Sequence, residues 1–309
     1  MRYIITLALA ATPTVALAEV PTVVTDIPPV HALVAQVMGD LGQPELLLAK
    51  GADEHDFQLR PSQAAAVADA GLVVWIGPEL TPWLDSALKA RPEGAAALGL
   101  LDAEATELRA YGEVEKSPDD HAHESHDTEE HDDHAHDGMD PHVWLDPGNG
   151  QVWLELIAVR LGELDPANAA TYTANAEAAA AGIAALDSEI AARLAPVKDK
   201  PVVTFHDAYG YFGAHYGLNF AGSIALGDAA SPGAARLSDL RTTLEAGEVL
   251  CIFPEVQHDP ARVEQMAEGT GARIGGALDP VGSSLEPGPG AYAALLGGMA
   301  ETIAECLEG

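Results

Sequence analysis

The chain has 309 residues and is 48% hydrophobic, which is enough apolar material for two folded domains with cores of their own. Its formal net charge of -33 excludes nucleic acid and anionic membrane surfaces as partners, because both repel such a chain, and it favours cations. No long apolar run follows the first residues, so we expect a soluble mature protein without membrane insertion.

Residues 1–18 are typical of a secretory signal peptide. Arg2 precedes an apolar run, and the small residues Ala16 and Ala18 lie just before Glu19, where a signal peptidase would cut. The alternative is a buried first helix. Export through this segment predicts a periplasmic protein.

Short apolar runs alternate with helical patterns up to about residue 110. Strands are expected at residues 21–27, 44–51 and 72–77, and helices at 30–40 and 61–71. In the second helix, Ser62 is a plausible N-cap and Gly71 a stop signal. This βαβα rhythm predicts a parallel sheet with helices on both faces.

The composition changes sharply at residues 112–140, which hold twelve acidic residues and almost no apolar side chain. Such a segment cannot bury a core, and we expect a mobile loop. Six histidines lie in it, at His121, His123, His126, His131, His134 and His136. Wrapping a cation would cost this segment entropy, so it is predicted to be a secondary, low-affinity metal loop that collects zinc. A charged, solubilising insertion is the alternative.

An Ala-rich helix is expected next, beginning at Asp165 and Pro166 and ending at Pro196. It is longer than an ordinary crossover helix and suggests a rod between two lobes. The predicted division is an N-terminal α/β lobe at 19–160, a linker helix at 161–197 and a C-terminal α/β lobe at 198–309.

The strand and helix rhythm resumes in the last third of the chain. Strands are expected within residues 200–212, 218–224, 249–255 and 272–280, and helices at 233–247, 259–271 and 290–309. Cys251 and Cys306 are the only cysteines. In an exported protein they suggest one disulfide, with two buried thiols as the alternative.

Three histidines stand where a loop meets a strand or a helix: His55, His142 and His206. His206 ends the apolar strand pattern of residues 201–205, and ligands of open parallel sheets gather at the carboxyl ends of strands. Three imidazoles with a carboxylate or water form a tetrahedral zinc site. The other ordered histidines are expected to have structural or surface roles: His31, His215 and His258.

Several longer motifs carry a family resemblance, namely HALVAQVMGD, GADEHDFQLRPSQAAAVADAGLVVWIGPEL, DPHVWLDP, TFHDAYGYF and LDPVGSSLEPGPGAYAALL. With the acidic His loop, they are similar to the zinc solute-binding receptors of bacterial ABC importers, the ZnuA-like cluster A-I family. The resemblance covers essentially the whole mature chain. It implies two α/β lobes, each a parallel sheet flanked by helices, joined by one long rigid helix with a metal cleft between them.

The same resemblance implies a function and a set of site residues. Zn(II) would be the transported ligand, bound by His55, His142 and His206 and delivered by a monomer to an ABC permease with its cytoplasmic ATPase. Glu54 or Asp279 would be the fourth ligand. The family also supports a disulfide between Cys251 and Cys306.

Three other functions stay open at this stage. A manganese or iron receptor is the nearest, although manganese-type relatives carry a carboxylate where His206 stands here. A periplasmic zinc hydrolase would use three imidazoles with Glu54 as base. However, the chain has no HExxH motif, so we expect no enzyme. A passive zinc buffer or surface adhesin is the last alternative.

Overall fold

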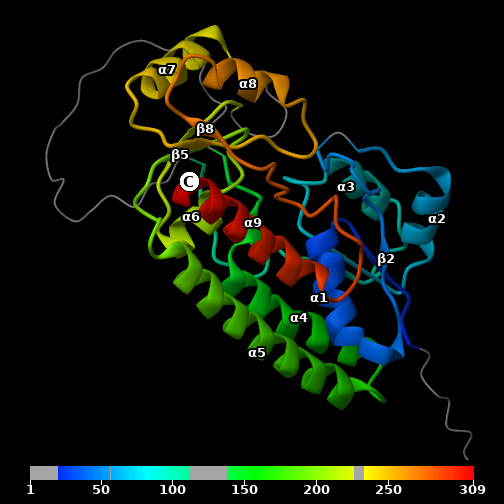
Figure 1. The fold of residues 1–309 in the computed structure, drawn as a ribbon. Coiled ribbons are helices and arrows are strands. Elements are labelled where there is room, and N and C mark those ends of the chain that lie inside the picture. The colour runs from blue at the N-terminus through cyan, green and yellow to red at the C-terminus, as the bar shows by residue number, and fades with distance from the viewer. Residues whose placement is uncertain (1–19, 56, 112–137, 226–232) are drawn as a thin grey trace, which may run out of the picture.

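The computed structural model describes residues 20–55, 57–111, 138–225 and 233–309, which form two α/β lobes joined by a long helix (Figure 1). The predicted signal peptide and the six loop histidines lie outside the described residues. Within the described ranges, no helix is both long and apolar enough to cross a membrane.

The first lobe contains a four-stranded parallel sheet in the order β2-β1-β3-β4. Its strands are β1 Val23–Thr25, β2 Glu45–Leu46, β3 Leu72–Trp75 and β4 Ala97–Gly99. Its helices are α1 Pro28–Met38, α2 Pro61–Asp69 and α3 Pro82–Lys89, and a 3-10 turn, η1 Gly39–Leu41, follows α1. β1 and β3 are buried throughout, as their unbroken apolar sequences predict. The predicted cap at Ser62 is wrong: proline fits the first helical turn, so α2 begins at Pro61 with Arg60 as N-cap.

The second lobe repeats this strand order as β6-β5-β7-β8. Its strands are β5 Val202–Thr204, β6 Phe220–Ser223, β7 Cys251–Ile252 and β8 Arg273–Ile274. Its helices are α6 Gly210–Tyr216, α7 Ala234–Glu245, α8 Ala261–Ala267 and α9 Ala291–Glu308. In this parallel sheet the strand order reverses at β5 and β7, because β6 is added on one side of β5 and β7 on the other, and the carboxyl ends of β5 and β7 form a crevice suited to ligands.

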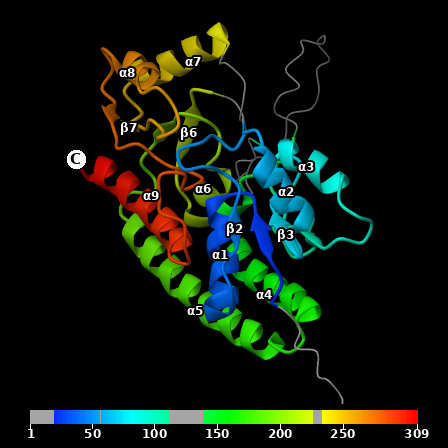
Figure 2. The same ribbon diagram turned by 90° about the vertical axis from the view of Figure 1, so that its right-hand side faces the viewer.

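The long helix predicted between the lobes is α5 Ala169–Leu194, which packs against α1 of the first lobe and α9 of the second, and beside it lies α4 Pro147–Leu164, preceded by the 3-10 turn η2 Val143–Leu145. They lie side by side along the molecule (Figures 1 and 2). The predicted single rod is wrong at its start. Asp165 ends α4 instead of capping α5, and its carboxylate accepts hydrogen bonds from Asn168 Nδ2 at 2.6 Å and Tyr172 Oη at 3.0 Å. These bonds fix the turn between the two helices.

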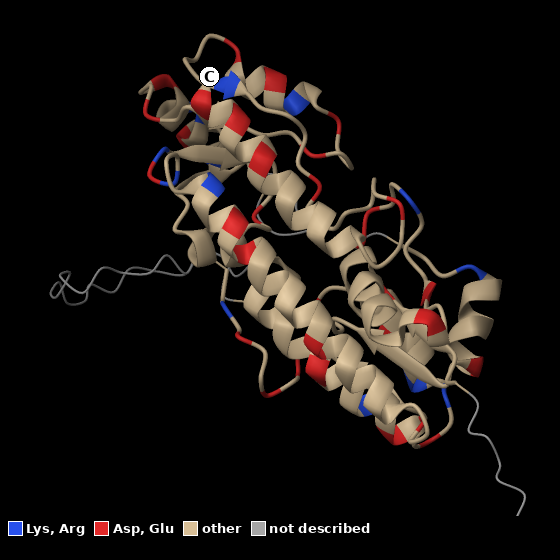
Figure 3. Ribbon diagram, turned by 60° about the horizontal axis from the view of Figure 1, so that its bottom comes forward, with Lys and Arg blue, Asp and Glu red and all other residues tan. Residues whose placement is uncertain are grey.

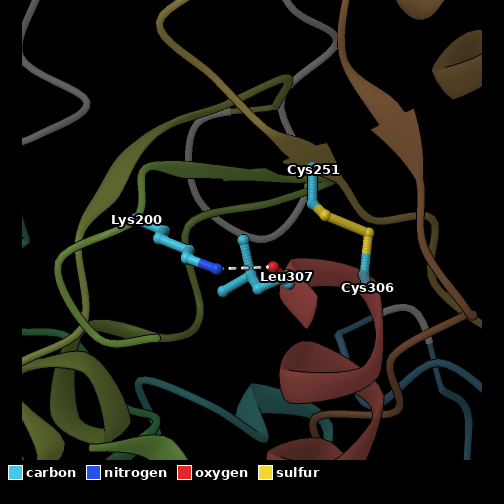
Figure 4. Close-up of a disulfide and its surroundings, with 4 residues drawn as sticks. All are labelled: Lys200, Cys251, Cys306 and Leu307. Atoms are coloured by element: carbon cyan, nitrogen blue, oxygen red, sulfur yellow. Dashed lines mark hydrogen bonds between the residues drawn. A yellow bond between two sulfur atoms is a disulfide. The ribbon is translucent and has the colours of Figure 1, made fainter. Parts of the chain in front are cut away.

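The predicted disulfide between Cys251 and Cys306 is present (Figure 4). It joins β7 to the last turn of α9, and nearby Lys200 Nζ donates to the carbonyl oxygen of Leu307 at 2.8 Å. The helix α9 also packs against α5 and against α1 of the first lobe. The carboxyl end of the chain therefore links the second lobe to the long helix and to the first lobe. Acidic residues are spread over both lobes and along the long helices, with few Lys and Arg between them (Figure 3).

Candidate metal centre

The three histidines singled out from the sequence come together between the lobes. His55 lies in the connection between β2 and α2, His142 directly precedes η2, and His206 follows β5. Their ring centroids are 5.4 to 6.3 Å apart. One ligand atom from each lies within 4.8 Å of the other two, so the three can contact one metal ion. We refer to His55, His142 and His206 as the three-histidine centre.

This centre is shielded from solvent. The side chains of His55, His142 and His206 are 10%, 0% and 7% exposed, and the Nε2 atom of each is buried. Trp144 walls one side, with its ring centroid 5.2 Å from that of His142. The wall is fixed, because Trp144 Nε1 donates to the carbonyl oxygen of Pro280 at 2.8 Å. A dry, rigid setting strengthens electrostatic attraction to a cation.

Two of the three imidazoles are oriented by carboxylates. His142 Nδ1 is 2.7 Å from Asp140 Oδ1, and His206 Nδ1 is 2.6 Å from Glu255 Oε2. A carboxylate accepts a hydrogen bond, so each Nδ1 carries the proton and each Nε2 keeps its lone pair for a metal. A carboxylate hydrogen-bonded to Nδ1 is typical of histidines that bind zinc through Nε2.

Glu255 is the more deeply placed of these carboxylates. It follows β7 and so faces His206, which follows β5, across the crevice of the second sheet. Burial by itself would raise the pKa of Glu255, but the His206 imidazole and hydrogen bonds from His206 and Tyr209 hold that pKa below its usual range. The side chain is therefore a buried anion that attracts a cation.

Neither Asp140 nor Glu255 was predicted to orient a histidine. Asp140, two residues before His142, could have been suspected from its position in DPHVWLDP. Glu255 could not, since its proximity to His206 depends on β5 pairing with β7, which the sequence does not reveal.

The two candidates for a fourth ligand differ in their surroundings. Glu54 is buried, and its Oε1 lies 3.6 Å from His55 Nε2. Burial raises the pKa of Glu54 to about 7, against the opposing effect of nearby His142 and His206, so a bound cation would favour its ionised form.

Asp279 instead serves its own loop. Its oxygens accept hydrogen bonds from the backbone N–H groups of Ser283 and Ser284 and from Gln257 Nε2. In the part of the chain that the structure describes, Asp279 belongs to no cluster of potential metal ligands.

The remaining ordered histidines lie outside the three-histidine centre. His31 is buried and has a structural role, but its partner is not local, because its Nε2 donates to the carbonyl oxygen of Pro44 at 3.1 Å. His215 lies between Asp146 and Asp187. His258 was expected at the surface but lines a pocket next to the centre, stacked on Phe205 with ring centroids 4.2 Å apart.

Comparison with known proteins assigns nearly the whole chain to one family. A model of the family described as "Zinc-uptake complex component A periplasmic" matches residues 23–306. The high-affinity zinc uptake system protein ZnuA of Paracoccus denitrificans is 50% identical over 302 residues, covering 94% of this chain and 93% of the relative. The protein of the same name from Brucella abortus is 38% identical and covers 92% of this chain and 91% of its own length.

Solved structures agree on the fold. A zinc-bound deletion mutant of a ZnuA protein superposes with a TM-score of 0.73 at 26% identity, covering 93% of this chain and 98% of that one. The protein FpvC of Pseudomonas aeruginosa, in complex with Mn2+, gives a TM-score of 0.78 at 22% identity over 94% of this chain and 99% of its own, which supports the fold alone. The family model matches residues 23–306 and the two relatives match over more than nine-tenths of their lengths, so this chain belongs to the family of periplasmic zinc-uptake components A.

Proposed function

We propose that this protein is a periplasmic receptor that binds Zn(II) at His55, His142 and His206, with Glu54 as the fourth ligand. The observation that carries the proposal is the convergence of three imidazoles, from three separate segments, between two lobes, with His142 and His206 buried and the side chain of His55 only 10% exposed. Neutral imidazole suits zinc, and three of them with one carboxylate satisfy its tetrahedral preference. Manganese prefers more oxygen ligands, so the same donor set favours zinc over manganese.

The receptor hands its zinc to an ABC permease with a cytoplasmic ATPase. The names of its relatives support this partnership, since ZnuA proteins are described as components of high-affinity zinc uptake systems. An ion held between lobes can be released when the lobes separate, because ligands then leave from both sides. We further propose that the protein acts as a monomer and that residues 1–18 direct its export.

A hydrolase is the less favoured function. A catalytic zinc keeps a coordination position open for water, whereas here Glu54 is buried next to His55 and in position to fill it. We expect the zinc-loaded protein to leave an activated ester unhydrolysed above the background rate. Measurable turnover that disappears with a chelator would establish an enzyme instead.

The His-rich segment provides secondary, weaker zinc binding beside the centre. Its two ends meet at the site: Tyr111 N donates to the carbonyl oxygen of Gly138 at 3.1 Å, and the Tyr111 ring centroid lies 6.5 Å from that of His142. Ions held by the segment are thus kept at raised local concentration next to the cleft.

Equilibrium competition against a zinc chelator tests the proposal. We expect one tight zinc ion in the wild type and its loss in His206→Ala, while His215→Gln, a change to a histidine outside the centre, leaves it intact. Cells that lack their own zinc receptor should grow in zinc-poor medium with the wild type but not with His206→Ala. Tight zinc binding that persists in His206→Ala would overturn the assignment.

A further inference from the structure

A pocket adjoins the three-histidine centre on its outer side, and we call it the outer pocket. Asp53, Glu54 and His55 of the first lobe line one wall, and Glu255, Gln257 and His258 of the second lobe line the other. His55 and His206 line the pocket and also belong to the centre, while His142 is not among the lining residues. The pocket therefore leads from the surface between the lobes to the metal ligands.

We propose that His258 and Glu255 form a second metal-binding position in the outer pocket, at which a divalent zinc ion pauses on its way to and from the three-histidine centre. The proposal rests on the function proposed above, since it describes how the same ion reaches the same site. His206, Glu255 and His258 form a cluster whose potential ligand atoms all lie within 4.8 Å of one another.

The distance between the two donors fits one ion. His258 Nε2 lies 3.6 Å from Glu255 Oε2, which is too long for a hydrogen bond. Two ligand atoms about 2.1 Å from a tetrahedral zinc are separated by roughly 3.4 Å. The pair is therefore spaced as ligands of a shared cation, with water completing the coordination.

The ring of His258 is held in place for this role. It stacks on Phe205, with an interplanar angle of 18° and ring centroids 4.2 Å apart. Phe205 directly precedes His206, so the strand end that supplies a ligand to the centre also supports the outer imidazole. A donor positioned in advance loses little conformational entropy when it binds an ion.

Glu255 serves both positions, because it is a ligand at the outer one and orients His206 at the inner one. An ion therefore binds only transiently at the outer position. The same oxygen, Oε2, contacts His206 Nδ1 and lies next to His258 Nε2. An ion at the outer position draws on the charge that orients His206, and two nearby dications repel each other. Simultaneous occupancy is therefore disfavoured, and the outer ion moves inward or leaves.

Exposure falls along the path from the surface. The side chain of His258 is 30% exposed, His55 is 10%, His206 is 7% and His142 is 0%. An entering ion meets His258 first and His142 last. It can exchange water for protein ligands in steps instead of losing its whole hydration shell at once.

A donor used only in transit lowers the barrier in both directions and leaves the final affinity unchanged. Removing the His258 donor should slow zinc release by about fivefold, which corresponds to about 1 kcal/mol in the barrier. The association rate should fall by the same factor, so that the dissociation constant is the same in variant and wild type.

The test uses two variants of the full chain. His258→Phe keeps an aromatic ring on Phe205 but has no nitrogen donor, and His258→Ala loses both the ring and the donor. Each protein is loaded with one equivalent of zinc and mixed with excess chelator, and the rate of the slowest release phase is measured together with the equilibrium constant.

We expect both variants to release zinc about fivefold more slowly at unchanged affinity. Release from His258→Phe at the wild-type rate would overturn the proposal, even if His258→Ala were slow, because the ring stack alone would then matter. A higher dissociation constant in His258→Phe would also overturn it, because His258 would then be a ligand of the final site. Wild-type protein that holds no tight zinc would instead refute the function proposed above.

Discussion

The orienting role of Glu255 leads to a prediction that separates its hydrogen bonds from its charge. Its two oxygens accept from different groups: Oε2 from His206 Nδ1 at 2.6 Å, and Oε1 from Tyr209 Oη at 2.8 Å and His206 N at 3.3 Å. A glutamine at this position has only one acceptor oxygen. In Glu255→Gln, its amide N–H₂ must therefore face either His206 Nδ1 or the His206 backbone N–H.

Both orientations disturb the zinc ligand. An N–H₂ group facing Nδ1 would move the imidazole proton to Nε2 and block the metal, while one facing the backbone N–H places two donors together. We therefore expect Glu255→Gln to weaken zinc binding by about 10- to 100-fold, the usual effect of losing a partner behind a metal-bound histidine. That range corresponds to about 1.4 to 2.7 kcal/mol.

Asp140→Asn is the matched control, because it removes the same charge at the other oriented histidine. A single oxygen of Asp140 accepts from both His142 N at 3.0 Å and His142 Nδ1 at 2.7 Å. An asparagine can keep both hydrogen bonds with its amide oxygen, so these bonds lose only the additional strength that the negative charge of Asp140 gives them. We expect its zinc affinity to fall by about fivefold or less.

Competition with a chromophoric chelator measures both dissociation constants, and thermal unfolding of the zinc-free proteins confirms that both variants are folded. Equal losses in the two variants would show that charge alone matters and that the imidazole proton is not controlled in this way. Wild-type affinity in Glu255→Gln would refute the orienting role altogether.

Three further predictions concern stability and stoichiometry. A hydrogen bond to Asp146 is the main cause that raises the pKa of His215 to about 9. The protonated His215 therefore stabilises the fold fully below its unfolded pKa of about 6.5, and this contribution to the free energy of unfolding disappears as pH rises through 9. His215→Gln should therefore lower the free energy of unfolding of zinc-free protein by about 1 to 2 kcal/mol more at pH 6 than at pH 10, and an equal loss at both values would contradict this. Replacing Cys251 and Cys306 by serine should lower the free energy of unfolding in denaturant by about 4 kcal/mol, because the disulfide closes a loop of 55 residues. The tight zinc ion should stay bound, and its loss would show that the disulfide is needed to form the metal site. Deleting residues 113–137 should keep the fold and the tight ion and remove only the weaker zinc equivalents in a titration, whereas unchanged stoichiometry would reduce the segment to a charged spacer.

The sequence predicted the fold class well because parallel strands buried on both faces leave unbroken apolar runs, as in Leu72–Trp75. It predicted the disulfide because an exported chain with two cysteines has few other uses for them. The start of the long helix was misplaced because Asp165 followed by proline fits a helix start equally well, whereas in the fold the Asp165 N–H donates to the carbonyl oxygen of Leu161 and ends α4.

The candidate site was predictable residue by residue but not as a set of contacts. His206 could be placed at a strand end, and His142 between two prolines, from local sequence alone. The partnership of His206 with Glu255 and the position of His258 depend on how β5 and β7 pair, which is a property of the folded sheet. Local sequence therefore identified the three histidines of the candidate centre, but not the groups that orient and surround them.

The central claim is that His55, His142 and His206 hold one zinc ion between the lobes. A crystal structure of the zinc-loaded protein, with anomalous scattering recorded on both sides of the zinc absorption edge, tests it most directly. The strongest peak should lie about 2.0 to 2.1 Å from Nε2 of each of the three histidines, with an oxygen of Glu54 completing the tetrahedron. A strongest peak elsewhere, or one in contact with fewer than three of these nitrogens, would contradict the claim.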